Sequence, residues 1–147
     1  MKKLLLLLPL LFLFACAKES SNSATILDVS VSGSENAYTF GVKITSPDVD
    51  CNQYTSWWEV LREDGSLVYR RILLHSHAKE QPFRRSGGVI AIFKDEAVYI
   101  RAHMNTSLYA GNVFKGSVAS GFFEVKNPPR FDNTIENLLP QPKECWY

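Results

Sequence analysis

The sequence predicts an all-β domain, and three observations lead to this prediction. Apolar and polar side chains alternate over several short segments, as they do in strands that bury one face. Turn-forming residues separate these segments at short intervals, and no long amphipathic helix pattern interrupts them. Seven such segments fit a seven-stranded antiparallel β-sandwich of immunoglobulin-like or fibronectin type III character. We expect this domain to span residues 25–129.

Residues 1–15 are predicted to be an export signal and not part of the fold. Two lysines precede an apolar run that is too short to span a membrane and is typical of a secretory signal. The run ends in LFAC, which resembles the lipobox of bacterial lipoproteins. This resemblance implies cleavage before Cys16 and attachment of lipid to Cys16. An ordinary signal peptide, cleaved at the same place and leaving a spare thiol, is the alternative.

Residues 16–24 are small and polar, which predicts a flexible, lipidated tether. Ala17 follows the acylation site, and in lipoproteins of two-membrane bacteria the absence of Asp at this position implies the outer membrane. We therefore expect a protein of the bacterial cell envelope whose partner is the lipid bilayer, reached through Cys16. The formal net charge of +1 predicts no basic face for nucleic acid.

The first two strands are expected at residues 26–31 and 38–45, where apolar and polar side chains alternate. The polar stretch GSEN between them predicts a turn. Pro47 ends the second strand because its nitrogen cannot donate a hydrogen bond to a neighbouring strand. A loop over residues 48–56 follows and carries Cys51.

Residues 57–62 and 67–74 are predicted to form a hairpin around an EDGS turn, whose glycine can adopt a positive φ. In the second of these strands Arg70 and Arg71 point to opposite faces, and both faces are largely apolar. One arginine must therefore lie on an apolar face, with its stem covering that face and its head reaching a carboxylate such as Glu59.

Residues 75–88 are predicted to form a long polar loop, and strands are expected at residues 89–93, 97–104 and 117–125, with a loop at 105–115. Long loops in compact domains are usually either functional or disordered. Any recognition by this protein is therefore expected at the first of these loops.

The C-terminal tail, residues 130–147, is expected to pack on the domain. Asn133 and Glu136 resemble a capping box at the start of a short helix. Cys51 and Cys145 are the two cysteines that remain when the third is acylated. Export places them in an oxidising compartment, so a disulfide between them is predicted; two buried free thiols are the alternative.

The chain resembles a group of uncharacterised small exported bacterial proteins in the stretches DCNQY (50–54), WWEV (57–60), YRRIL (69–73), HSH (75–77), EQPF (80–83) and RSGG (85–88). The resemblance covers roughly residues 26–125. It carries no known activity and no assigned site, so it implies nothing about function.

Three histidines are candidate metal or ligand-binding residues. His75 and His77 form a His-x-His pair, which points both imidazoles to one side of an extended segment. His103 would add a third nitrogen if the fold brings it alongside. Imidazole suits Zn and Cu, so the pattern indicates a candidate site for either metal. The alternative is that each histidine orders the loop through hydrogen bonds, or pairs with an acidic residue such as Glu80 or Asp95.

Five arginines form a candidate anion-binding group, because guanidinium groups can hold carboxylate, sulfate or phosphate in a bidentate manner. They are Arg70, Arg71, Arg84, Arg85 and Arg101. The alternative, which the sequence favours, is that these side chains order the long loop through carboxylates such as Glu59 and Glu80.

The sequence contains no nucleophile elbow, phosphate-binding glycine loop or zinc-protease helix motif. We therefore predict a non-catalytic binding module, anchored in the envelope, whose ligand is a protein or a glycan. An envelope protein that binds Zn or Cu through His75, His77 and His103 is the alternative. A small hydrolase built on the long loops is a third possibility.

Overall fold

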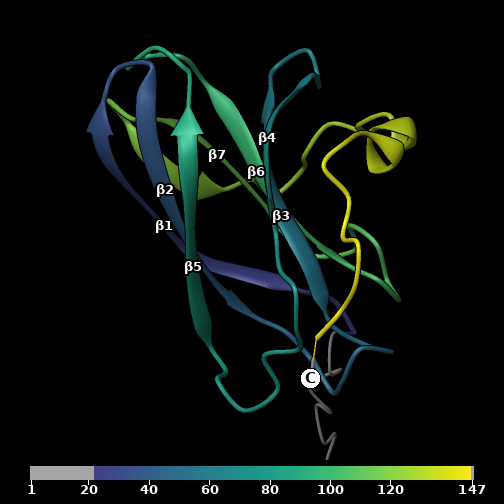
Figure 1. The fold of residues 1–147 in the computed structure, drawn as a ribbon. Coiled ribbons are helices and arrows are strands. Elements are labelled where there is room, and N and C mark those ends of the chain that lie inside the picture. Colours follow the sequence, from purple (N-terminus) through teal and green to yellow (C-terminus); the bar gives the residue numbers. More distant parts are fainter. Residues whose placement is uncertain (1–21, 147) are drawn as a thin grey trace, which may run out of the picture.

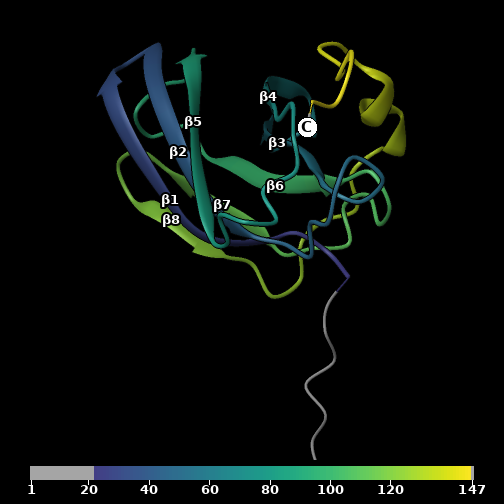
Figure 2. The ribbon, with the colours of Figure 1, turned by 60° about the horizontal axis from the view of Figure 1, so that its bottom comes forward.

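The computed structural model describes residues 22–146 of the chain. The predicted signal peptide, the acylation site Cys16 and most of the predicted tether lie outside these residues. The described chain forms two antiparallel sheets packed face to face, which is an all-β sandwich as predicted (Figures 1 and 2). Its strands are β1 (Thr25–Ser34), β2 (Ala37–Thr45), β3 (Thr55–Arg62), β4 (Leu67–Ile72), β5 (Phe83–Ile90), β6 (Val98–Met104), β7 (Val113–Ser117) and β8 (Gly121–Glu124).

One sheet has the strand order β1-β2-β5, and the other has the order β4-β3-β6-β7-β8. The alternating segments of the sequence supply the core between them. Phe40, Val42 and Ile44 point inward from β2 and are fully buried, and Trp58 and Val60 of β3 belong to the same buried cluster. Burial of one such side chain contributes about 1.5–3 kcal/mol, so this cluster holds the two sheets together.

Strand β5 begins well before the position that the sequence pattern predicts. The expected strand at residues 89–93 and the expected loop at 75–88 are both wrong, because only residues 73–82 connect β4 to β5. The polar composition of β5 concealed it. Phe83 and Ile90 are its only buried residues, and the positions between them are exposed or half-buried.

The predicted loop at residues 105–115 and the predicted strand at 117–125 are also corrected. Strand β7 begins within that loop, and a tight turn separates it from β8. The hydroxyl groups of Ser117 and Ser120 close the turn by accepting hydrogen bonds from each other's backbone N–H. Gly121 follows with a φ of +78°, a conformation that favours glycine. The described domain therefore has eight strands and not seven.

The C-terminal tail packs over the outer face of the five-stranded sheet (yellow in Figure 1). It contains one short 3-10 helix, η1 (Asn133–Asn137), and Ile135 of this helix is buried against the sheet. Asp132 caps the helix by accepting a hydrogen bond from the backbone N–H of Thr134 at 2.8 Å. The predicted cap at Asn133 is therefore wrong by one residue.

Cys51 and Cys145 form the predicted disulfide, with their Cα atoms 5.7 Å apart. The bond connects the loop that follows β2 to the end of the tail. Immediately beyond it, the backbone N–H of Trp146 donates a hydrogen bond to the carbonyl of Leu74 at 2.6 Å. The last described residues are therefore held against the loop that follows β4.

The antiparallel strands give the sandwich two ends. We call one of them the loop end: it contains the loops at residues 46–54, 73–82 and 105–112, together with Trp146 and the start of β1 (lower part of Figure 1). The opposite end, which we call the distal end, contains the shorter turns and the loop at residues 91–97. No helix within residues 22–146 is both long and apolar enough to cross a membrane.

Candidate functional site

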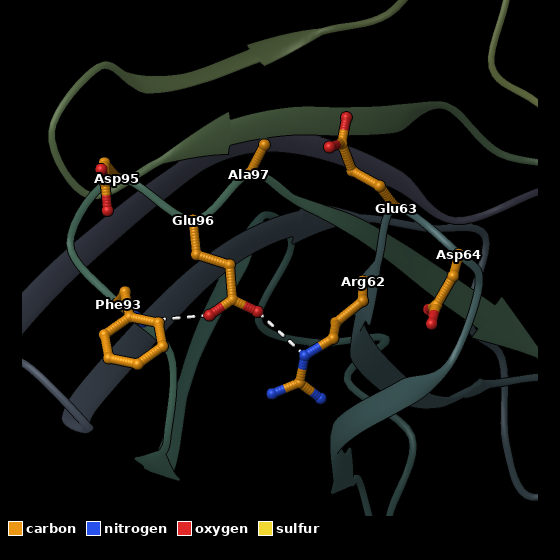
Figure 3. Close-up of a pocket in the computed structure, with 7 residues that line it drawn as sticks. All are labelled: Arg62, Glu63, Asp64, Phe93, Asp95, Glu96 and Ala97. Atoms are coloured by element: carbon orange, nitrogen blue, oxygen red, sulfur yellow. Dashed lines mark hydrogen bonds and ion pairs between the residues drawn. The ribbon is translucent and has the colours of Figure 1, made fainter.

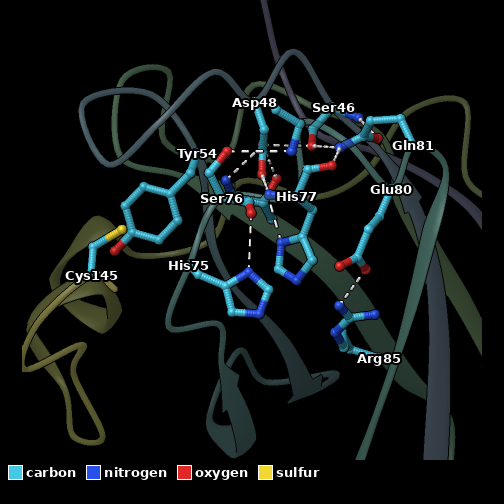
Figure 4. Close-up of polar contacts among 12 residues, drawn as sticks. Ser46, Asp48, Tyr54, His75, Ser76, His77, Glu80, Gln81, Arg85 and Cys145 are labelled. Carbon is cyan, nitrogen blue, oxygen red and sulfur yellow. Dashed lines mark hydrogen bonds and ion pairs between the residues drawn. The ribbon is translucent and has the colours of Figure 1, made fainter. Parts of the chain in front are cut away.

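The loop end is organised around the buried carboxylate of Asp48 (Figure 4). It accepts hydrogen bonds from the backbone N–H and the hydroxyl of Thr55 at 2.9 and 3.1 Å, and from the hydroxyl of Ser46 at 2.7 Å. The backbone N–H of His77 donates to its second oxygen at 2.9 Å. One carboxylate thus fixes the start of β3 and the loop that follows β4.

Burial by itself would raise the pKa of Asp48, but the hydrogen bonds from His77, Ser46 and Thr55 outweigh it, so this pKa lies below its ordinary value. The side chain is therefore ionised at neutral pH. Because a carboxylate can accept several hydrogen bonds at once, Asp48 holds two loops in one arrangement.

His75 and His77 lie side by side, with ring centroids 4.4 Å apart (Figure 4). The ring of His77 is buried, stacks on Phe83 at 3.9 Å and places Nδ1 3.7 Å from the Asp48 carboxylate. His75 is half-buried, and its backbone pairs with that of Trp146. His77 therefore supports the loop from inside, while His75 lies nearer the surface.

A hollow of about 570 Å³ opens between these loops and the C-terminus. Val49, the Cys51 side of the disulfide and Trp146 supply much of its mainly apolar lining. Val49 is 64% exposed and Trp146 is 60% exposed. The polar residues of its lining are Asp50, His75, Ser76, His77, Lys79 and Glu80. A mainly apolar lining with a few polar groups is typical of ligand-binding sites.

The structure does not bring the three histidines together. His103 lies on the outer face of β6, beneath the tail, where it stacks on Trp57 at a centroid distance of 3.7 Å. Within residues 22–146, no group of three or more His, Cys, Asp or Glu side chains is placed to hold a metal ion. The condition under which His103 would add a third nitrogen is therefore not met: His103 contacts Trp57 and Glu136 on the tail side of the sheet, whereas His77 packs on Phe83 of the core.

Two of the five arginines meet one carboxylate beneath the tail. Arg70 and Arg101 donate through Nε to the two oxygens of Glu59, at 2.8 and 2.7 Å. All three residues are buried. The prediction that one arginine lies on a buried face and reaches Glu59 is confirmed, and that arginine is Arg70.

Arg70 also clamps the tail. Its guanidinium donates to the carbonyls of Ile135 at 2.7 Å and Leu138 at 2.6 Å, with longer contacts to those of Glu136 and Pro140. These donors are used within the protein. The geometry therefore indicates a structural role for Arg70 and not an open anion site.

The Arg101 guanidinium stacks over the Tyr109 ring at 3.5 Å, and Trp57 Nε1 donates to the Tyr109 hydroxyl at 3.2 Å. Burial and the neighbouring charge of Glu59 raise the pKa of Tyr109 to about 12, so this hydroxyl stays neutral. Arg101, like Arg70, is part of the packing between the sheet and the segments that cover it.

The other three arginines lie apart from this cluster. Arg71 donates to the carbonyls of Ser86 at 2.9 Å and Ile72 at 2.8 Å, linking β4 to β5. Arg84 of β5 reaches across β2 to pair with Asp28 of β1, and Arg85 pairs with Glu80 of the preceding loop at 2.6 Å. The structure thus distributes the five guanidinium groups over several contacts.

The buried imidazole of His103 predicts a dependence of stability on pH. Burial, followed by the charges of Arg70 and Arg101, lowers its pKa from 6.5 to about 3. The Glu136 carboxylate has an oxygen 3.5 Å from Nε2 of His103. Between these two pH values the unfolded chain binds a proton that the folded protein does not, so stability falls as the pH is lowered.

We expect the free energy of unfolding to be highest above pH 6.5 and to fall below it, with a slope of up to about 1.4 kcal/mol per pH unit from this group. Urea unfolding at pH 7 and at pH 4.5 measures the difference. The control is His103→Phe, which keeps a ring on Trp57 and removes the titrating group. An equal loss of stability in the variant would show that another group causes it.

A second hollow, of about 560 Å³, lies at the distal end (Figure 3). Glu96 accepts a hydrogen bond there from Arg62 at 2.9 Å and another from the backbone N–H of Phe93 at 3.0 Å. Glu63, Asp64 and Asp95 add negative charge around it. We place the candidate site at the loop end, because the buried hydrogen bonds of Asp48 position two of the loops that line its hollow.

In comparisons with known proteins, no family model matches this chain, and no curated protein or solved structure shows significant similarity to it.

Sequence reasoning did not identify Asp48, Val49 or Trp146 as parts of the site. Asp48 could have been suspected from the turn sequence SPD, since Asp often orders a turn through its side chain. The one feature of the sequence that could have drawn attention to Trp146 is its position next to Cys145. Nothing local to Val49 distinguishes it from a core residue.

Proposed function

We propose that this chain is a lipid-anchored, non-catalytic binding module of the bacterial cell envelope. The apolar N-terminal run, the LFAC sequence and the polar segment after it support the anchor at Cys16. The hollow at the loop end, with Trp146 exposed beside it, is the observation that supports binding. Exposed Trp side chains surrounded by polar groups are typical of residues that carry binding energy.

We further infer that the sandwich is of the immunoglobulin-like type. When β1 to β7 are labelled A, B, C, C′, E, F and G, the sheets have the orders A-B-E and C′-C-F-G, with β8 as an extra edge strand. In immunoglobulin variable domains the B–C and F–G loops lie at the end that binds ligand. Their counterparts, residues 46–54 and 105–112, lie at the loop end here. This is an analogy of fold, so the chemistry of the hollow carries the functional argument.

The ligand we propose is an envelope protein or a glycan. Both can place an apolar surface on Trp146 and Val49 and exchange hydrogen bonds with Asp50, Lys79 and Glu80. The hydrogen bonds of Asp48 give the hollow a defined shape before binding, which reduces the entropy lost when a ligand is held.

Site-specific photo-crosslinking in the intact envelope tests this proposal. We expect a photoreactive p-benzoylphenylalanine in place of Lys79, beside the hollow, to give adducts with a protein or a glycan. The same group in place of Lys94, which is exposed at the distal end, is the matched control. No adduct from position 79, or equal adducts from both positions, would overturn the proposal.

Trp146→Ala should weaken the same interaction without unfolding the domain. Trp146 is 60% exposed, so its truncation removes contact surface and little core packing. Loss of a Trp at the centre of an interface commonly costs about 2 kcal/mol or more, which is roughly a thirtyfold loss of affinity. The measurement is the crosslink yield from position 79, with the melting temperature as a check on folding. An unchanged yield would exclude Trp146 as a ligand contact.

Cys16→Ala should abolish lipid attachment, because the thiol that would carry it is removed. We expect the variant to leave the membrane fraction or to remain unprocessed, and labelled fatty acid to be absent from it. Incorporation of label into the variant would show that Cys16 is not the site. For the native protein, recovery in the inner membrane would contradict the proposed outer-membrane location.

A further inference from the structure

Several large apolar side chains are exposed at the loop end. They come from all three loops and from the C-terminus. Val49 (64% exposed) and Trp146 (60%) line the hollow, and Leu74 (45%) and Leu108 (46%) are exposed in the loops at residues 73–82 and 105–112. The three loops are joined by hydrogen bonds, including one from the Asn105 side chain to the Cys51 carbonyl at 3.1 Å. These side chains therefore belong to one connected surface and not to separate loops that move apart.

The chain also enters the domain at this end. Thr25, the first residue of β1, pairs with Thr45, the last residue of β2, beside the loop at residues 46–54. Ala24 is buried, and its carbonyl lies against Gly111 in the loop at residues 105–112. The entry point of the tether is thus fixed to the loop end and not to the distal end.

The length of chain before this point limits how far an anchor can lie from it. Cys16 precedes Asn22, the first described residue, by only a few positions. A fully extended chain spans at most about 3.3–3.6 Å per residue, so an acylated Cys16 lies within roughly 20 Å of that residue. An anchor of this reach keeps the loop end, where the chain enters the domain, within that distance of the bilayer.

The chemistry of this surface fits the boundary between lipid and water. Trp is enriched at membrane interfaces because its ring is apolar and its indole N–H is polar. Asp50, Lys79 and Glu80 lie among the apolar side chains, and their charges favour contact at headgroup depth over deeper insertion.

We propose that the loop end lies on the bilayer surface, with Trp146 and its apolar neighbours at the level of the lipid headgroups. This inference rests on the lipid anchor of the proposed function. It adds that the hollow at the loop end opens toward the bilayer. Because Trp146 is also a proposed ligand contact, a protein or glycan that binds the hollow must bind at the bilayer surface or displace Trp146 from it.

The native tryptophans allow a direct test. Trp57 and Trp58 are buried and only Trp146 is exposed, so a quencher placed in the bilayer reports on Trp146. The acylated protein is reconstituted in phosphatidylethanolamine and phosphatidylglycerol vesicles, with or without bromine on the acyl chains. We expect brominated vesicles to quench the emission of the wild-type protein and to leave that of Trp146→Phe almost unchanged.

A matched variant places the probe at the other end. In Trp146→Phe/Phe93→Trp, the exposed tryptophan occupies position 93, whose native side chain is 57% exposed at the distal end. We expect no quenching from this position. Equal quenching from position 93, or none from Trp146, would overturn the inference.

The mass of the reconstituted protein separates the two possible failures. If Cys16 carries no acyl chain, the proposed anchor is wrong and the inference falls with it. If Cys16 is acylated and Trp146 is not quenched, the anchor stands and only the orientation is wrong.

Discussion

Glu59→Gln should destabilise the domain by about 3–5 kcal/mol, which is the usual cost of breaking a buried ion pair by removing one partner. The substitution keeps the size of the side chain and removes its charge. Arg70 and Arg101 would then remain buried without a counter-ion. Because Arg70 also holds the carbonyls of η1 and the residues after it, we expect the tail to loosen as well.

Glu63→Gln is the matched control. Glu63, in the turn after β3, pairs with Lys115 of β7 at 2.6 Å, but both side chains are substantially exposed. Exposed ion pairs contribute about 0–1 kcal/mol, so this variant should unfold almost as the wild type does. Urea unfolding of both variants at pH 7 gives the comparison. A loss in Glu59→Gln as small as that in Glu63→Gln would show that the buried cluster is not held by its charges.

Removal of the disulfide should have the second largest effect. Cys51 and Cys145 are separated by 94 positions in the sequence. Loss of a native disulfide from a small secreted domain costs about 2–5 kcal/mol, with the long closed loop favouring the upper part of this range. We expect Cys51→Ala/Cys145→Ala to lower the free energy of unfolding by this amount.

Reduction of the disulfide should make the two ends of the tail sensitive to protease at different rates. From the sequence, the whole segment from Arg130 is expected to become sensitive to protease. The structure narrows this expectation, because Ile135 is buried and Arg70 holds the carbonyls of residues 135–140. Trypsin should therefore cleave after Lys143 first and after Arg130 only later. Simultaneous cleavage at both sites would show that the disulfide, and not Arg70, holds the tail.

The sequence located strands best where burial is one-sided. In β2, Tyr38, Phe40, Val42 and Ile44 alternate with residues of the other face, and its predicted and observed bounds differ by one residue. In β5 the stretch RRSGG conceals the strand, because its hydrogen bonds to β2 depend on a partner that is distant in sequence. A local pattern reports burial on one face and cannot report pairing of this kind.

The candidate site was predicted only in part. The loop that carries His75 and His77 lines the hollow, and its part in recognition stays a prediction. The most exposed apolar residues that line the hollow are Val49 and Trp146, and both lie far in sequence from that loop. His103 was grouped with the other histidines by residue type alone, and the alternation of β6 places it under the tail.

The sequence by itself determined the class of the fold and the disulfide, because alternation and an even number of remaining cysteines are local or countable properties. Only the tertiary structure decided that Arg70, and not Arg71, is the buried arginine, since the pairing of β3 with β4 places Arg70 opposite Glu59. The tertiary structure also brought the Asp48 loop, the His77 loop and the C-terminus into one surface. Contacts between segments this far apart arise from packing and hydrogen bonding across the fold, and no periodicity within one segment encodes them.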